Sequence, residues 1–212
     1  NQPSEAGRWG RRMAEAKCGT GARASAAVAR GREIETSAAF AEARQLFEDK
    51  RFEEAAVLYV KLVDTNPRHK DSPAAINNAA VSYESVQRFE SATRLYERVW
   101  RDYPESEFAD TALFRAAVNY QRFFEFDHAV TNYLILVDNP RYKKSKHRAD
   151  ALYNAAQLLE SDQAYERAAD LFKRYARVID KDEEAAEAFF RAGKSYEKAR
   201  SLDKMTAAFL DL

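Results

Sequence analysis

From Thr36 onward, small and large apolar residues recur along the chain at a nearly fixed spacing. A small residue is followed four residues later by an aromatic one as Ala55/Tyr59, Ala92/Tyr96, Ala129/Tyr133, Ala168/Phe172 and, in degraded form, Met205/Phe209. These pairs lie 37, 37, 39 and 37 residues apart. A further small residue lies twelve residues before each pair, at Ala43, Ala80, Ala117, Ala156 and Gly193. A fixed period of this length is typical of a repeat protein.

Each period predicts two antiparallel helices. Small residues at the paired positions let the helix backbones cross closely, because a side chain larger than a methyl group would push them apart. An aromatic residue or leucine opens each second helix, at Phe52, Phe89, Phe126, Tyr165 and Leu202. One pair alone leaves apolar surface exposed, so stacking buries it, at about 1.5–3 kcal/mol per large side chain. The sequence therefore predicts an all-α stack of about five hairpins.

These residues resemble the tetratricopeptide repeat (TPR), whose pattern runs W-x2-L-G-x2-Y, then A-x3-F, then a closing proline. Pro67 and Pro104 occupy the closing position, Pro140 comes one residue early, and Asp180 replaces the proline of the fourth repeat. The opening tryptophan is replaced by Ala39, Ile76, Leu113, Leu152 and Phe189. The resemblance covers roughly Thr36 to Leu212 and implies a right-handed α-solenoid.

The predicted organisation is an amino-terminal arm, residues 1–35, followed by a TPR array, residues 36–212. The repeats are expected at about 36–72, 73–109, 110–148, 149–185 and 186–212, the last one truncated. The arm holds five of the six glycines, Gly7, Gly10, Gly19, Gly21 and Gly31. Glycine costs a helix about 1 kcal/mol relative to alanine. We therefore expect short helical pieces, Arg8–Lys17 and Ala22–Glu35, broken by a turn at Cys18–Gly21, in an irregular arm that folds back on the structure.

A spacing of 37 exceeds the 34 residues usual for the TPR family. The added turn falls at the junctions, where Asp71-Ser72-Pro73 predicts a helix start with a capping side chain and a proline in the first turn. The stretch Asp102–Tyr120, DYPESEFADTALFRAAVNY, resembles bacterial cell-envelope TPR proteins of the BamD and CpoB type. That resemblance implies a periplasmic or outer-membrane-associated protein, and a cytoplasmic location is the alternative.

Composition excludes several classes of function. Lys plus Arg and Asp plus Glu are both 34, so no net field attracts nucleic acid. Cys18 is the single cysteine, which rules out an intrachain disulfide or a cysteine cluster. The longest strongly apolar run, Tyr133–Val137, is far shorter than the roughly 20 residues that cross a bilayer. The chain starts at Asn1 and its fifth repeat stops early at Leu212, so we expect a fragment whose native chain continues.

No catalytic or metal-binding motif stands out. His69, His128 and His147 lie apart, without the spacing of a metal site, and are expected to be solvated. Glu53/Glu54 and Glu183/Glu184 fall in first turns of helices, where they complement the helix dipole. We expect no enzyme activity, cofactor or metal.

The resemblance also implies a binding groove on the first helix of each hairpin. The second, fifth, sixth, ninth, twelfth and thirteenth residues of each repeat are expected to line this groove. The fifth residues form a stripe able to take apolar side chains of a peptide or helix, or to pack on neighbours within the fold. They are Phe40, Asn77, Phe114, Tyr153 and Phe190. Polar residues around the stripe could hydrogen-bond an extended main chain. They are Arg44, Asn78, Arg115, Gln121, Arg122, Asn154, Gln157, Arg191 and Lys194.

A basic stretch follows the third repeat. Residues 141–148 carry five positive charges, which could meet an acidic partner, anionic lipid or RNA, or could form a solvated loop. The charges belong to Arg141, Lys143, Lys144, Lys146 and Arg148.

The sequence therefore predicts a non-catalytic protein-protein interaction scaffold that binds a peptide, helix or partner domain within a multiprotein complex. A bacterial envelope or motility assembly is the first hypothesis, with peripheral or lipid-anchored membrane association in the full-length protein. A cytoplasmic TPR adaptor within a larger protein is the second. An RNA-binding helical repeat that uses the basic stretch is the third.

Overall fold

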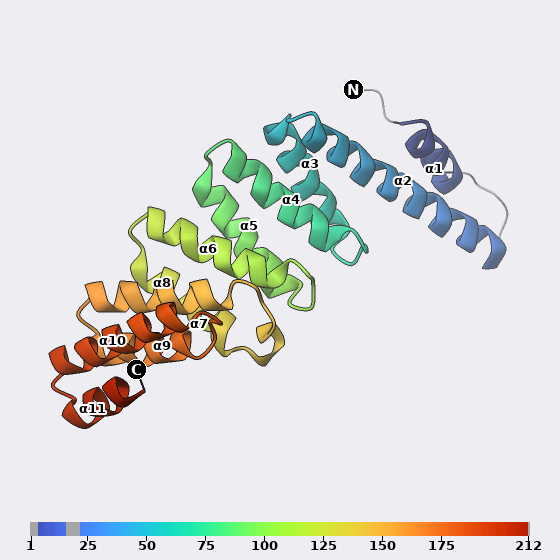
Figure 1. Cartoon of the computed structure of the whole chain (residues 1–212). Helices are drawn as coiled ribbons and strands as arrows, with labels where there is room; N and C mark the ends of the chain where they lie inside the picture. The colour runs from blue at the N-terminus through green and yellow to red at the C-terminus, as the bar shows by residue number, and fades with distance from the viewer. Residues whose placement is uncertain (1–3, 16–21, 212) are drawn as a thin grey trace. The chain divides into compact units, whose positions relative to one another are not determined.

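The computed structural model describes residues 4–15 and 22–211, and every regular element in these ranges is helical (Figure 1). The predicted all-α fold is confirmed. The helices group into two compact units, Asn1–Tyr103 and Pro104–Leu212. The turn predicted at Cys18–Gly21 lies outside the described residues.

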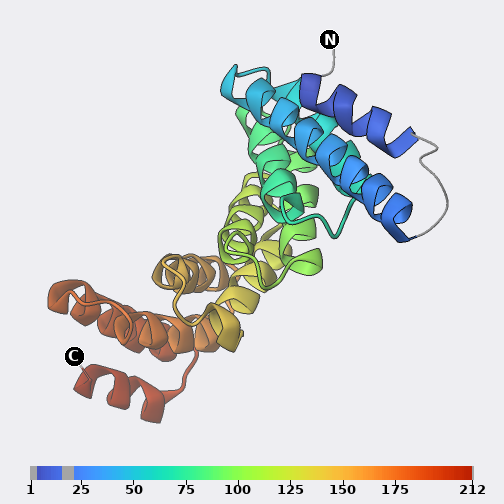
Figure 2. The same cartoon turned by 90° about the vertical axis from the view of Figure 1, so that its right-hand side faces the viewer.

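The first unit begins with a short helix and a long one. Contacts join α1 to α2, α2 to α3, α3 to α4 and α4 to α5, so each helix packs on the next along the chain (Figures 1 and 2). Two hairpins result, α2–α3 and α4–α5, with α1 on the outside of the first. The helices are α1 (Glu5–Glu15), α2 (Ala22–Glu48), α3 (Phe52–Thr65), α4 (Ser72–Ser85) and α5 (Phe89–Asp102).

The second unit contains three hairpins, α6–α7, α8–α9 and α10–α11. Contacts also join α7 to α8 and α9 to α10, which stack the hairpins in chain order. The helices are α6 (Ala109–Arg122), α7 (Phe126–Asp138), the 3-10 helix η1 (Pro140–Tyr142), α8 (Arg148–Ser161), α9 (Tyr165–Ala176), α10 (Asp182–Lys198) and α11 (Leu202–Leu210).

The core follows the predicted small-residue register. The paired alanines of the first four hairpins are fully buried, and the aromatic residues four places on, Tyr59, Tyr96, Tyr133 and Phe172, are at most 2% exposed. In the last hairpin, a Cβ atom at Gly193 would collide with the ring of Phe209. The prediction that helix pairs cross at small residues is confirmed.

Each hairpin turns at a residue in the left-handed region, and none of these residues is glycine. In the first turn the amide of Arg51 donates to the carbonyl of Leu46 at 2.9 Å, which satisfies a carbonyl at the end of α2. The equivalent bond closes the other four turns. The left-handed residues are Lys50, Gln87, Phe124, Gln163 and Arg200, with φ of 60°, 61°, 62°, 61° and 59°.

Three glycines of the arm, Gly7, Gly10 and Gly31, lie inside helices. Gly10 on α1 faces Gly31 on α2, and a Cβ atom at Gly10 would lie 2.7 Å from the Gly31 carbonyl oxygen. A Cβ atom at Gly31 would lie 2.8 Å from the backbone nitrogen of Ala14. The two helices therefore touch backbone to backbone. Gly10 and Gly31 fall inside the helical pieces that the sequence predicts, and the close contact they allow offsets their helix cost.

The long helix α2 crosses the boundary placed between arm and array. It runs from Ala22 to Glu48 without a break at Glu35. Its amino-terminal part packs on α1 through Gly31, and its carboxyl-terminal part forms a hairpin with α3 through Ala43. One helix thus serves both segments, and residues 22–35 extend the first hairpin.

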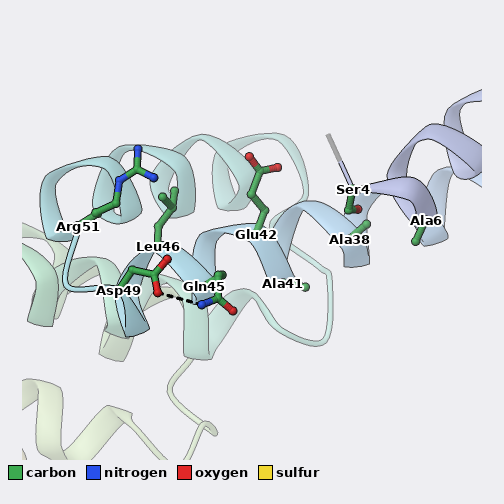
Figure 3. Close-up of a pocket in the computed structure, with 9 residues that line it drawn as sticks. All are labelled: Ser4, Ala6, Ala38, Ala41, Glu42, Gln45, Leu46, Asp49 and Arg51. Atoms are coloured by element: carbon green, nitrogen blue, oxygen red, sulfur yellow. Dashed lines mark hydrogen bonds between the residues drawn. The ribbon is translucent and has the colours of Figure 1, made fainter. Parts of the chain in front are cut away.

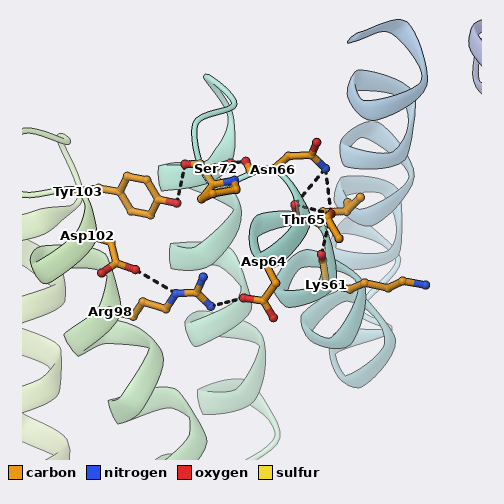
Figure 4. A network of polar contacts seen from close by, with 10 residues as sticks. Lys61, Asp64, Thr65, Asn66, Ser72, Arg98, Asp102 and Tyr103 are labelled. Carbon is orange, nitrogen blue, oxygen red and sulfur yellow. Dashed lines mark hydrogen bonds and ion pairs between the residues drawn. The ribbon is translucent and has the colours of Figure 1, made fainter. Parts of the chain in front are cut away.

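Polar contacts join the two hairpins of the first unit (Figure 4). Arg98 on α5 donates to Asp64 on α3 at 2.6 Å, and the Tyr103 hydroxyl donates to the carbonyl of Pro67 at 2.9 Å. The Ser72 hydroxyl donates to the carbonyl of Asn66 at 2.7 Å, across the turn before α4. Bonds of this kind fix the turn between one hairpin and the next.

The start of α4 differs from the prediction in one respect. Proline lies in the first turn, as expected, but the side chain of Asp71 makes no capping hydrogen bond. The Asp71 carboxylate instead lies 3.8 Å from His69 Nδ1. The turn residues therefore hold each other, and the amides of α4 are left without that cap.

Candidate partner-binding face

In the first unit, the fifth-place aromatic of α2 is covered by the fold itself. Phe40 is 2% exposed, and its ring stacks on His69 from the α3–α4 turn, with centroids 4.7 Å apart. Ser37 Oγ and His69 Nε2 share a hydrogen bond of 3.4 Å. The histidine is thus part of the core, and the expectation that it is solvated is wrong. Asn77, at the same place on α4, is half-buried.

The second unit repeats this arrangement on α6. Phe114 is half-buried and stacks on His147 from the α7–α8 turn, with centroids 4.6 Å apart. Thr111 Oγ1 lies 3.3 Å from His147 Nε2. Burial lowers the pKa of His147 below its ordinary value. His147 is therefore a packing residue as well, whereas His128 is exposed and pairs with Glu125.

On α8 the fifth-place residue is Tyr153, which sits among other side chains of the unit. Its ring lies 5.2 Å from Tyr175 and 6.0 Å from Phe172, centroid to centroid. Arg191 Nη1 donates to the Tyr153 hydroxyl at 2.9 Å. Tyr153 is half-buried, so one part of the ring stays accessible. Tyr175, on α9, belongs to this aromatic group and was not predicted from the sequence.

Phe190 on α10 is the open member of the stripe. It is 50% exposed, against 2% for Phe40. Its described ring contact is with Phe209 on α11, at 5.9 Å between centroids. No histidine stacks on Phe190 within the described residues, unlike Phe40 and Phe114. The stripe therefore ends in an exposed aromatic surface.

Several polar residues of the predicted groove join neighbouring hairpins. The Tyr133 hydroxyl donates to Gln121 Oε1 at 2.6 Å and accepts from Asn154 Nδ2 at 3.3 Å. Burial raises the pKa of Tyr133 to about 12, so the phenol keeps the proton that it donates. Gln121 and Asn154 thus stabilise the stack of α6, α7 and α8.

A charged cluster makes the equivalent joint one hairpin later. Glu160 on α8 accepts hydrogen bonds from Arg191, Ser195 and Lys198 of α10, at 2.9, 3.2 and 3.3 Å. Burial alone would raise the pKa of Glu160, but the bonds from Arg191 and Lys198 outweigh it and hold the pKa below its ordinary value. The Arg191 guanidinium also lies 4.3 Å from the centroid of the Phe172 ring.

Glu160 was missed by the sequence reasoning. It occupies the twelfth place of its repeat, where only amides and cations were selected as groove residues. Arg191 occupies the sixth place of the next repeat. An acidic residue and a basic residue at two groove places of consecutive repeats were the signal that could have revealed this ion pair.

The remaining predicted groove residues lie at the surface or near it. Arg44, Arg115, Arg122, Gln157 and Lys194 are exposed, and Asn78 is half-buried. Lys194 pairs with Glu197 on its own helix. Gln157 on α8 and Lys194 on α10 share the ninth place of consecutive repeats, four residues after Tyr153 and Phe190, so each lies on the same face of its helix as the fifth-place aromatic residue. Gln157, Lys194 and Phe190 form an exposed part of the predicted site in the second unit.

The basic stretch is only partly open. Arg141 pairs with Glu105, and Arg148 Nη1 donates to the carbonyl of Val137 at 2.6 Å, at the end of α7. The intervening Lys143, Lys144 and Lys146 are exposed. Two of the five cations therefore fix the α7–α8 turn, and three lysines form the charged surface.

The first unit also has a groove that the sequence did not indicate (Figure 3). It has a volume of about 570 Å³ and lies beside α2, with an apolar floor that includes Ala38, Ala41 and Leu46. Glu42 and Arg51 line it as well, while Gln45 donates to Asp49 at 3.0 Å along its edge. No histidine or cysteine is among the described residues that line this groove.

Two further properties bear on function. Within residues 4–15 and 22–211, no group of three or more His, Cys, Asp and Glu side chains could hold a metal ion. The helices of the same residues are too short or too polar to traverse a lipid bilayer.

The family model of the tetratricopeptide repeat matches residues 78–106, from within α4 to just beyond α5. A search of curated proteins gives no match.

Solved structures with TPR-like repeats share the fold. A crystal structure of the MamA protein has a TM-score of 0.54 at 14% identity, over 82% of this chain and 87% of that chain. MamA AMB-1 has a TM-score of 0.54 at 14% identity, over 84% and 89%. A variant of a putative kinesin light chain from Podosopora anserina, with nearly identical TPR-like repeats, has 0.50 at 13% identity, over 82% and 91%. At such low identity these structures support the TPR-like fold and nothing finer.

Proposed function

We propose that this protein is a non-catalytic scaffold that binds a helix or extended peptide of a partner protein on the first helices of the second unit. The observation that carries the proposal is that all three first helices of this unit carry an aromatic residue at the fifth place, Phe114, Tyr153 and Phe190, and that the residues four places after the last two, Gln157 and Lys194, are exposed. A half-exposed phenylalanine on a preformed helix loses little conformational freedom on binding. Little of the free energy gained by burying its ring is therefore offset by ordering the side chain.

The surroundings of Phe190 suit a partner with both apolar and polar side chains. Gln157 can donate to and accept from a main chain, and Lys194 can pair with an acidic side chain. Tyr153 presents the accessible part of its ring on the preceding first helix. The partner segment would place an apolar residue on Phe190 and an acidic residue near Lys194.

We further propose that this binding belongs to a bacterial envelope assembly, in the periplasm or at the outer membrane. The support is the resemblance of Asp102–Tyr120 to envelope TPR proteins. The cytoplasmic adaptor is the competing hypothesis. Fractionation of the native organism, followed by detection of the protein in each compartment, decides between them.

Site-specific photo-crosslinking tests the binding face. A photoreactive phenylalanine analogue replaces Phe190 or Gln157, and crosslinked partners are identified by mass spectrometry. Val57, which is 60% exposed on α3 of the first unit, is the control position. The proposal predicts one shared partner at positions 190 and 157 and no crosslink to that partner at position 57.

The identified partner segment is then titrated against Phe190→Ala. Loss of one anchor side chain should weaken binding by about 2 kcal/mol, roughly 30-fold. Leu210→Ala is the matched control, because Leu210 is 82% exposed on α11, which carries none of the predicted groove residues. Equal affinities of the protein and Phe190→Ala would refute this site.

A further inference from the structure

The outer face of α1 displays an exposed tryptophan between two arginines. Its inner face is set by Gly7 and Gly10, which are buried against α2. Because α1 lies so close to α2, side chains on its opposite side point outward. Trp9 is 63% exposed, and Arg8 and Arg12 lie beside it. A tryptophan flanked by two arginines is thus displayed on a helix held by backbone contacts.

The side chains of this face already touch one another. The Arg12 guanidinium lies 5.8 Å from the centroid of the Trp9 ring, and Arg8 lies 3.7 Å from Glu5. Together these four residues line a shallow depression of about 210 Å³. The Arg8–Glu5 pair is solvent-exposed on both sides, so it is weak and an external anion can replace the carboxylate. Arg11 points elsewhere and pairs with Glu35 on α2.

Charge is unevenly distributed between the arm and the repeats. Residues 1–35 carry seven basic and four acidic side chains, whereas the remaining residues carry 27 and 30. Six of the seven basic residues are arginines. Net positive charge is therefore concentrated in residues 1–35, although the whole chain is neutral. An anionic surface would attract this arm more strongly than the repeats.

We propose that the outer face of α1 docks on anionic lipid headgroups at a membrane surface. The Trp9 indole would enter the interfacial layer, where its apolar body and its N–H group are both accommodated. Arg8 and Arg12 would hydrogen-bond phosphate oxygens on either side of the ring, since guanidinium matches phosphate geometry. The helix would lie parallel to the membrane plane.

A single aromatic residue on an eleven-residue helix favours lipid over single-stranded nucleic acid. Proteins that bind single strands stack successive bases on several aromatic side chains along a groove. On α1 the exposed face has one such ring. The membrane proposal does not depend on partner binding at Phe190, because it concerns the first unit alone.

Vesicle flotation tests the proposal directly. The protein is mixed with phosphatidylcholine vesicles that contain or lack phosphatidylglycerol. We expect binding to the anionic vesicles only, and reversal by high salt. Trp9→Ala should weaken that binding about tenfold, and Arg8→Gln with Arg12→Gln about 30-fold. All three side chains are exposed, so circular dichroism should show unchanged helicity.

The matched control is Lys143→Gln with Lys144→Gln, which removes two exposed charges from the α7–α8 turn without touching α1. This double variant should bind anionic vesicles like the unaltered protein. Equal loss in the lysine variant would overturn the proposal, because net charge alone would then explain binding. It is overturned equally by binding to neutral vesicles, by full binding of Trp9→Ala, or by an oligonucleotide that displaces the vesicles.

Discussion

In the first unit His69 stacks on Phe40, and in the second His147 stacks on Phe114. An aspartate–arginine bridge also recurs between second helices, as Asp64–Arg98 and as Asp138–Arg174, at 2.6 Å in both. Neither contact is described between the two hairpins α8–α9 and α10–α11. Each unit therefore has one pair of neighbouring hairpins with both contacts, and the two pairs lie about two repeats apart in the sequence.

The units differ in what lies at the fifth place. The first unit buries Phe40 and places an amide, Asn77, on its second hairpin. The second unit carries three aromatics there, of which Phe190 is 50% exposed. In both units the covered ring belongs to the first hairpin, and the covering histidine comes from the turn after that hairpin's second helix. The two units thus share the packing scheme and differ in how many aromatic residues they place at the fifth position.

The largest expected effect comes from the contact that both units share. Ala117→Trp should destabilise the second unit by at least about 3 kcal/mol, because Ala117 is fully buried where two helices cross. Ala80→Trp should do the same in the first unit, whereas Ala207→Trp, on an exposed site of α11, should change little. Thermal unfolding followed by circular dichroism measures all three. An unchanged melting temperature for Ala117→Trp would contradict the packing register.

The arm of the first unit offers a matched pair of glycines. Gly10→Ala should destabilise the packing of α1 by about 1–3 kcal/mol, since its Cβ atom would lie 2.6 Å from the backbone nitrogen of Glu35. Gly7→Ala has room, with nearest atoms at 3.4 and 3.6 Å, and should stabilise α1 by about 0.5–1 kcal/mol. Limited proteolysis of the arm reports both changes. Equal protease sensitivity of the two variants would exclude the backbone contact.

The charged joint of the second unit can be made neutral by replacing Glu160, the residue that accepts hydrogen bonds from three side chains of α10. Glu160→Gln should destabilise by about 1–2 kcal/mol at neutral pH, because Arg191 and Lys198 lose a charged acceptor. The pKa of Glu160 is lower in the folded protein than in the unfolded chain, where it has the usual glutamate value of about 4.3. The ionised carboxylate therefore adds to the free energy of unfolding above about pH 4.3, and this stabilisation is lost as the pH falls through the folded pKa. Urea unfolding at neutral and acidic pH should therefore show the two proteins converging in acid. If the difference in unfolding free energy between the two proteins did not change with pH, the substitution would act through packing and not through the charge of Glu160.

These contacts also mark how far the sequence alone could go. The alanine register was predictable, because small residues at a fixed period have one simple use, a close helix crossing. The contact between Gly10 and Gly31 was not predictable, because these residues come together only once α1 packs on α2. His69 and His147 were misread for a similar reason: each lies in a turn between hairpins, and its stack on a first-helix ring exists only once the chain has folded.

The sequence selected polar residues for the candidate site but did not give their contacts. Asn154 and Arg191 make hydrogen bonds between hairpins, and Gln121 makes one within its own hairpin. A polar residue at the predicted groove places needs a hydrogen-bond partner, which can lie on a neighbouring helix or on another protein. Exposure, which the sequence does not give, separates Phe190 from Phe40 and Phe114. Binding by these residues stays a prediction.

The smallest expected effect concerns the left-handed turn residues, where the two units again have counterparts. Phe124→Gly and Gln87→Gly should each stabilise by about 1 kcal/mol, because glycine adopts φ near 60° without the Cβ penalty. Phe124 also meets Phe126 edge to face at 6.1 Å, although it is 79% exposed. If that contact stabilises the turn, Phe124→Gly should gain less than Gln87→Gly, by a few tenths of a kcal/mol. Equal gains would show that the aromatic pair contributes nothing to the fold, which leaves its exposed rings free to act on something outside the chain.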